Sequence, residues 1–220
     1  MEKQQYLDLL DKQPWRDADA WFGDLHKHGC EKVGDIEIDS TQIIEFTKNN
    51  FDLAEVCTEE VVQDHWDEGQ NILCKINRTM GRSAGNTTEF NFGMQGDSNA
   101  KLLQIIGKHN LETLGLHPKH VLARLIVNMP GNGLAYHYDN PKKFFKMFPS
   151  VDESANIVRY WFSAIDWLPG QVMQVGDTVL HHWNKGEVYN IPWGVPHASM
   201  NFGYHIKYTI GLTGVLVDEQ

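Results

Sequence analysis

The chain has 220 residues, 41% hydrophobic and 22% charged, which suits one globular domain with an extended N-terminal part. Its formal net charge of −10 lacks the basic character of proteins that bind nucleic-acid phosphates, so nucleic acid is not an expected partner. The polar N-terminus does not read as a signal peptide, no apolar run reaches membrane-span length, and three widely spaced cysteines indicate reduced thiols, so we expect a cytoplasmic protein.

The first half of the chain is mixed in character and predicts mainly helices. Residues 40–49 are expected to form a helix because Ser40 or Thr41 can cap its start and Ile43 lies on its apolar side. Residues 99–114 show the clearest helical stripe, and Gly115 follows its end. The other elements expected here are partly helical stretches at 5–10 and 17–26 and a short strand at 86–94.

From residue 121 the periodicity changes to that of short strands separated by Gly and Pro turns. The pair Gly176-Asp177 fits a turn between two strands inside one such run. Strand runs are expected at 121–129, 157–167, 172–183, 187–191 and 205–217. This pattern predicts an α+β fold, in which residues 119–220 form a jelly roll and residues 1–118 form a mixed helical support within one integrated domain.

A candidate pair of metal ligands follows a glycine-rich turn at residues 131–133. His137 and Asp139 are two apart, so on a strand they point to the same face. Their Cα atoms would lie about 7 Å apart, close enough to hold one metal at ligand distances of about 2.0–2.2 Å. A second H-x-D sequence, His65 to Asp67, lies in an acidic, polar stretch and is expected to be a solvated segment.

The sequence from Gly186 to Asn201 resembles the second signature motif of the cupin superfamily. It spells G-x5-P-x-G-x2-H-x3-N, with His197 as the histidine. The first cupin motif begins G-x5-H-x-H, and residues 131–139 have the same frame with Asp139 in place of the second histidine. The resemblance implies a cupin-like double-stranded β-helix. His137, Asp139 and His197 would form the two-histidine, one-carboxylate triad that is typical of Fe(II) oxygenases and leaves open positions on the metal.

Residues beyond the triad resemble the 2-oxoglutarate oxygenase superfamily. Lys207 follows His197 by ten residues, where that superfamily commonly has a base that binds the remote carboxylate of 2-oxoglutarate, and Thr209 follows two residues later. Within the superfamily, residues 121–215 look like the aspartyl/asparaginyl β-hydroxylase group. In that group an arginine at the start of the middle strand helps to hold the cosubstrate, which makes Arg159 a candidate. Lys207 stands where that group has arginine.

The resemblance implies a non-haem Fe(II)- and 2-oxoglutarate-dependent dioxygenase that uses O2 to hydroxylate a C–H bond of a protein side chain or small molecule. One alternative is a cupin-type metalloenzyme that does not use 2-oxoglutarate. A second is a non-catalytic jelly roll that binds a sugar or another ligand. The sequence predicts neither the substrate nor the oligomeric state.

Other clusters of potential ligands are expected to be structural. His181 and His182 are adjacent, so on a strand they would face opposite sides. Residues 26–28 and Cys30 alternate ligand types, but no fourth ligand follows at zinc-finger spacing. Lys142 and Lys143 are expected in a loop, either solvated or meeting the substrate beside the metal motif.

Overall fold

The structure is a computed structural model that describes residues 29–56, 89–93, 96–137, 139 and 141–217. The helical stretches expected at 5–10 and 17–26 lie outside these residues, as do the H-x-D sequence at residues 65–67 and the histidines at 26 and 28. Among the helices of the described part, none combines the length and hydropathy needed to span a bilayer.

Two antiparallel sheets face each other. The larger has the strand order β1 (Glu31–Asp35), β9 (Glu187–Asn190), β6 (Ile157–Ser163), β11 (Lys207–Leu216), β4 (Leu116–Asn128), β3 (Glu89–Phe92) and β2 (Glu55–Val56). The smaller has the order β5 (Gly133–His137), β10 (His197–Asn201), β7 (Gln171–Val175) and β8 (Thr178–Leu180). Strands distant in sequence are neighbours in both sheets, as in a jelly roll. The predicted α+β jelly roll is confirmed.

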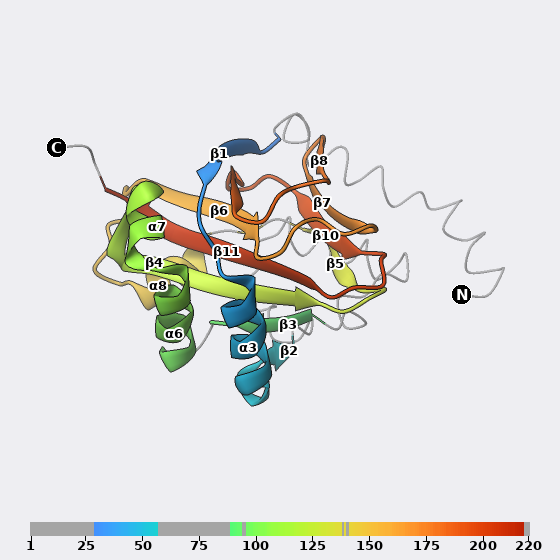
Figure 1. Cartoon of the computed structure of the whole chain (residues 1–220). Coiled ribbons are helices and arrows are strands. Elements are labelled where there is room, and N and C mark those ends of the chain that lie inside the picture. The colour runs from blue at the N-terminus through green and yellow to red at the C-terminus, as the bar shows by residue number, and fades with distance from the viewer. Residues whose placement is uncertain (1–28, 57–88, 94–95, 138, 140, 218–220) are drawn as a thin grey trace, which may run out of the picture.

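The helices cover the outer face of the larger sheet. Helices α3 (Ser40–Asn49), α6 (Gly96–Ile106) and α7 (Lys108–Thr113) lie together against the long strands β4 and β11 (Figure 1). Their apolar sides meet alternate residues of β11, such as Ile210 and Leu212, which are fully buried. The main hydrophobic core therefore lies between the helices and the sheet, which leaves the opposite face of the sheet for a site.

Several expected boundaries differ in the structure. The single helix expected at residues 99–114 is two helices, because Gly107 between them has a φ of +84°, which interrupts the helical backbone. Asp39 caps α3, not the expected Ser40 or Thr41, and its carboxylate accepts hydrogen bonds from two backbone N–H groups of the first turn. The loop expected at Lys142 and Lys143 is a short helix, α8 (Lys142–Met147).

A second, smaller core fills part of the space between the two sheets. Trp161 on β6 packs edge-on against Trp183, with ring centroids 5.2 Å apart, and Met173 and Val175 on β7 complete the contact. All four side chains are at least 96% buried. This cluster closes the interior on the side of Lys207, because the Lys207 ammonium lies 5.5 Å from the centre of the Trp183 ring.

Candidate metal site

Three side chains with metal-ligating atoms converge between the sheets. His137 and His197 are direct partners across the antiparallel pair β5 and β10, and their ring centroids are 4.3 Å apart. Asp139 lies just beyond the end of β5, with carboxylate oxygens 3.9 Å from His137 Nε2 and 3.5 Å from His197 Nε2. One ligand atom from each residue lies within 4.8 Å of the others. Within the described residues, no other three such side chains converge in this way.

The hydrogen bonds of His197 prepare it to act as a ligand. Its Nδ1 lies 3.0 Å from the backbone oxygen of Val195, and this oxygen can only accept a hydrogen bond. Nδ1 therefore carries the hydrogen, and the lone pair of Nε2 faces Asp139 and the centre of the site. Burial lowers the pKa of His197, and the nearby charge of Arg159 lowers it further, which favours the neutral ring. A neutral imidazole fixed in this way is the usual metal ligand.

Arg159 supplies the positive charge of the site in the structure. One nitrogen of its guanidinium, Nη2, is 2.5 Å from Asp139 Oδ2 and 3.0 Å from His197 Nε2. Burial alone would raise the pKa of Asp139, but the positive charge of Arg159 opposes this effect, and the pKa lies well below its ordinary value. Asp139 is therefore a carboxylate, as metal binding requires.

The donor set fits a divalent transition metal. Two imidazoles and one carboxylate are the ligands that Fe(II), Mn(II) and Zn(II) accept, and the three come from one end of the small sheet. His137 is 13% exposed and Asp139 is 30% exposed, so solvent reaches the site from one side. A bound cation would compete with Arg159 for the same oxygen and nitrogen lone pairs.

Lys207 lies on the inner face of the larger sheet and is completely buried. Its ammonium donates hydrogen bonds to the backbone oxygen of Val172 and to Ser199 Oγ, both at 2.8 Å. Ser199 is two residues from His197 on β10. Ser199 therefore lies on the same face of β10 as His197, where it accepts the hydrogen bond from Lys207. The two-residue period of a strand could have identified Ser199 from the sequence.

Buried polar atoms near Lys207 have no hydrogen-bond partner among the described residues. The side-chain oxygen and nitrogen of Asn128 are both in this state, and Asn128 is the direct partner of Lys207 across β4 and β11. The Trp183 ring nitrogen is also unpartnered. Thr209 is fully buried on the same face, and its hydroxyl makes only a long contact, 3.5 Å, with the backbone oxygen of Ile126. Sequence reasoning did not identify Asn128, because its role depends on its pairing with β11.

The adjacent histidines 181 and 182 do not belong to this group of converging ligands. The strand run expected to extend to residue 183 ends at Leu180, so the two histidines are not on a strand, and their Nδ1 atoms are in contact. His182 has a φ of +58° and packs on Trp167, with ring centroids 3.9 Å apart. Both histidines are exposed. Within the described residues they join no third ligand.

No family model matches the chain, and no curated protein matches its sequence. The solved structures that it resembles include a predicted oxalate decarboxylase of Thermotoga maritima (12% identity, 48% of this chain and 74% of that chain, TM-score 0.32). They also include a cupin domain of an XRE-family transcriptional regulator from Enterobacter cloacae (10% identity, 44% and 84%, TM-score 0.32) and the Cnp3 cupin domain of Schizosaccharomyces pombe (11% identity, 44% and 56%, TM-score 0.30). These likenesses are too distant to identify a family or an activity, and the fold assignment rests on the strand order and pairing.

Proposed function

We propose that the protein is a non-haem Fe(II)- and 2-oxoglutarate-dependent oxygenase whose metal ligands are His137, Asp139 and His197. The observation that carries the proposal is the convergence of two imidazoles and one carboxylate, with the lone pair of His197 Nε2 aimed at the common centre. Three protein ligands leave room on the metal for a cosubstrate that binds through two atoms and for O2. When bound, Fe(II) and 2-oxoglutarate supply an oxidative decarboxylation that yields succinate and CO2 and oxidises a C–H bond.

The chain's own residues bind and orient these groups. The buried ammonium of Lys207 and the hydroxyl of Thr209 share one strand face, and both are suited to the remote carboxylate of 2-oxoglutarate. The unpartnered amide of Asn128 beside Lys207 supports this role, because a bound carboxylate would accept the hydrogen bond that its Nδ2 lacks. Trp161 and Trp183 exclude water from the same end of the interior.

A specific observation favours a second function, a metalloenzyme of the same fold that does not use 2-oxoglutarate. The ammonium of Lys207 already donates to Val172 O and Ser199 Oγ, so part of its hydrogen-bonding capacity is used within the protein. The substitution Lys207→Met separates the two functions. For the oxygenase, it should weaken 2-oxoglutarate binding at least tenfold and leave Mn(II) affinity within twofold of wild type. For the alternative function, neither metal binding nor catalytic activity should depend on 2-oxoglutarate.

An assay of succinate release tests the proposal. Chelator-treated protein is reloaded with Fe(II) and given 2-oxoglutarate and O2 with a panel of candidate substrates, and succinate release is measured. We expect metal-dependent succinate release that Asp139→Ala and His197→Ala abolish. His181→Ala is the matched control, because it removes an exposed imidazole outside the site. Succinate release by Asp139→Ala at the wild-type rate would refute the assignment of the ligands.

A further inference from the structure

The small sheet has an outer face that is turned away from the candidate metal site. His197 and Ser199 on β10 point to the interior, so the alternation of side chains along a strand turns Ala198 and Met200 outward. The pairing of β10 with β7, and of β7 with β8, continues this face across the sheet. Its other described side chains on β7 and β8 are Val172, Gln174 and Val179.

This outer face is apolar and carries no charge among its described side chains. Two valines, a methionine and an alanine accompany a single glutamine, although 22% of the chain is charged. Val179 on the edge strand β8 is 50% exposed, and Val172 and Met200 are half-buried. Met200 lies over Gly133 of β5, because a Cβ atom added to Gly133 would be 2.5 Å from its sulfur. A sheet buries its apolar faces against another layer, so this face requires a cover.

The described helices do not provide this cover. Helices α3, α6 and α7 lie on the larger sheet, and Phe148, which follows α8, meets the ring of His120 on β4. Figure 1 shows these helices to the left of and below the strands of the small sheet. The cover therefore comes from a part of the chain outside the described residues or from another molecule.

The N-terminal segment joins the described structure at the edge of the small sheet. Gly29 is packed so closely against the start of β8 that a Cβ atom added to it would be 1.9 Å from Thr178 Oγ1. Residues 1–28 are therefore attached to the molecule beside β8, the strand that carries Val179. The three steps from residue 26 to Gly29 span up to about 10 Å, which is enough to pass around this edge to the outer face.

The sequence just before this point predicts an amphipathic helix. In residues 17–26, the positions i, i+3, i+4 and i+7 are Ala18, Trp21, Phe22 and Leu25. These positions share one side of a helix, and the three aspartates of the stretch lie outside that side. A helix of ten residues is about 15 Å long, and four strands at a spacing of about 4.8 Å span about 14 Å. The predicted helix therefore has both the apolar side and the length to cross the small sheet.

We propose that residues 17–26 dock as an amphipathic helix on the outer face of the small sheet. Trp21 and Phe22 then pack on the valines and on Met200 of this face, and methionine sulfur makes favourable contacts with aromatic rings. The aspartates of the helix face solvent. The same sheet carries both candidate histidine ligands on its inner face, so the docked helix supports the strands of the metal site from behind.

Hydrogen exchange of the full-length chain, followed by mass spectrometry, measures this docking. We expect the backbone amides of residues 17–26 to be protected in wild type and to exchange at least tenfold faster in Val179→Asp, which places a charge on the face. Trp21→Ala should have the same effect from the side of the helix, although alanine favours helix formation, and it leaves the roll untouched if Val179→Asp fails to fold.

A matched variant separates docking from a general effect of a surface charge. Val33 on β1 of the larger sheet is 46% exposed, close to the value for Val179, and Val33→Asp should exchange within twofold of wild type in residues 17–26. Unprotected amides in the wild-type stretch would overturn the proposal. Equal acceleration by the two aspartate variants would overturn it as well.

A photo-crosslink identifies what covers the face. Phe22 is replaced by p-benzoylphenylalanine in a mixture of unlabelled and isotopically heavy chains, and the crosslinked peptides are sequenced. We expect crosslinks within one chain to peptides that contain Met200 or Val179, and at least fivefold less when Ala20, on the opposite side of the predicted helix, is replaced instead. Crosslinks between light and heavy chains would assign the face to a second copy. Crosslinks confined to other strands would leave it to an outside partner, and either result would overturn the proposal.

Discussion

The contact between Asp139 and Arg159 predicts a large loss of stability when one partner is removed. In chelator, where no metal contributes, Asp139→Ala leaves the guanidinium of Arg159 without its carboxylate partner. Breaking a fully buried ion pair costs about 3–5 kcal/mol, whereas an exposed pair contributes about 1 kcal/mol or less. Because the Asp139 side chain is 30% exposed and the Arg159 side chain 16% exposed, we expect a loss of about 2–3 kcal/mol in the free energy of unfolding.

Urea unfolding followed by tryptophan fluorescence measures this loss. In a double-mutant cycle, Asp139→Ala combined with Arg159→Met should lose at least about 1 kcal/mol less than the sum of the single losses, because the unpaired charge is gone. Asp52→Ala, which removes an exposed carboxylate from a short surface helix, should change stability by about 0.5 kcal/mol or less. Losses that simply add, or an Asp139→Ala variant as stable as Asp52→Ala, would refute the reasoning.

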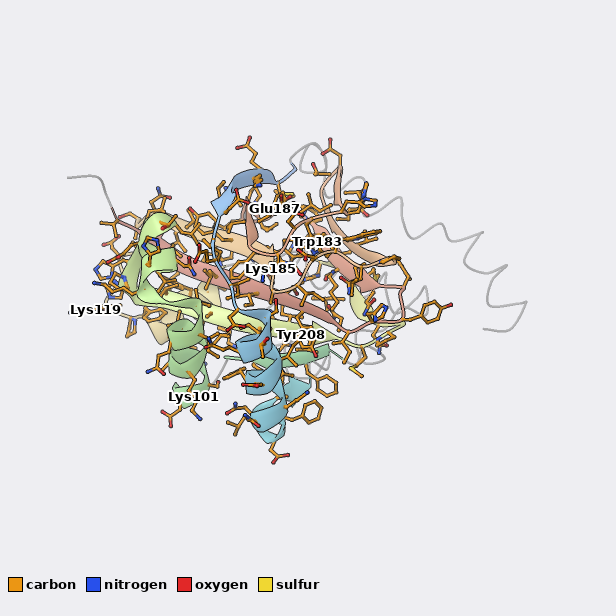
Figure 2. All side chains as sticks on the ribbon, in the orientation of Figure 1. Lys101, Lys119, Trp183, Lys185, Glu187 and Tyr208 are labelled. Carbon is orange, nitrogen blue, oxygen red and sulfur yellow. The ribbon has the colours of Figure 1, made fainter. Side chains whose placement is uncertain are left out.

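Three further predictions concern the fold around the site. Glu187 lies beside β1 (Figure 2) and has a pKa of about 2: burial opposes the shift, but hydrogen bonds from Asn184 and Lys32 outweigh it. Its folded pKa is below its ordinary value of 4.5, so its stabilisation is present above about pH 5 and lost as the pH falls toward 2; Glu187→Gln should flatten the acid limb of a stability–pH profile, and an unchanged limb would contradict this. Asn110→Ala should cost about 2–3 kcal/mol in urea unfolding, because its amide donates to the backbone oxygens of Glu37 and Ile106, both at 2.6 Å; a loss below about 1 kcal/mol would count against it. Gly107→Ala should destabilise by about 1–2 kcal/mol, because φ is +84° there, and a more stable variant would mean that the helix break is not required.

The triad could be predicted because local rules bring two of its members together. The two-residue period of a strand predicts that His137 and Asp139 point to the same side. In the structure His137 is the last residue of β5 and Asp139 lies just beyond it, and their ligand atoms still converge. His197 was predicted from the cupin-like motif between Gly186 and Asn201. In the structure it lies beside His137 because the two residues pair directly across β5 and β10. The jelly roll was likewise readable from short apolar runs punctuated by Gly and Pro.

Other features depend on contacts that no local pattern encodes. The apolar stripe at residues 99–114 continues across Gly107, so periodicity alone predicts one helix where the backbone breaks. Strand β1 is largely exposed at the edge of the sheet and has no alternating apolar signal. The hydrogen bond from Lys207 to Val172 joins residues 35 apart in sequence. Such partners follow only from the packing of the two sheets.

The central claim is that His137, Asp139 and His197 hold one metal ion, and a crystal structure grown anaerobically with Mn(II) and 2-oxoglutarate tests it most directly. The anomalous signal of manganese locates the ion independently of the protein density. The account predicts one peak about 2.0–2.2 Å from a ligand atom of each of the three residues. A chain whose only manganese peak lies elsewhere, with Arg159 still bonded to Asp139, would contradict it.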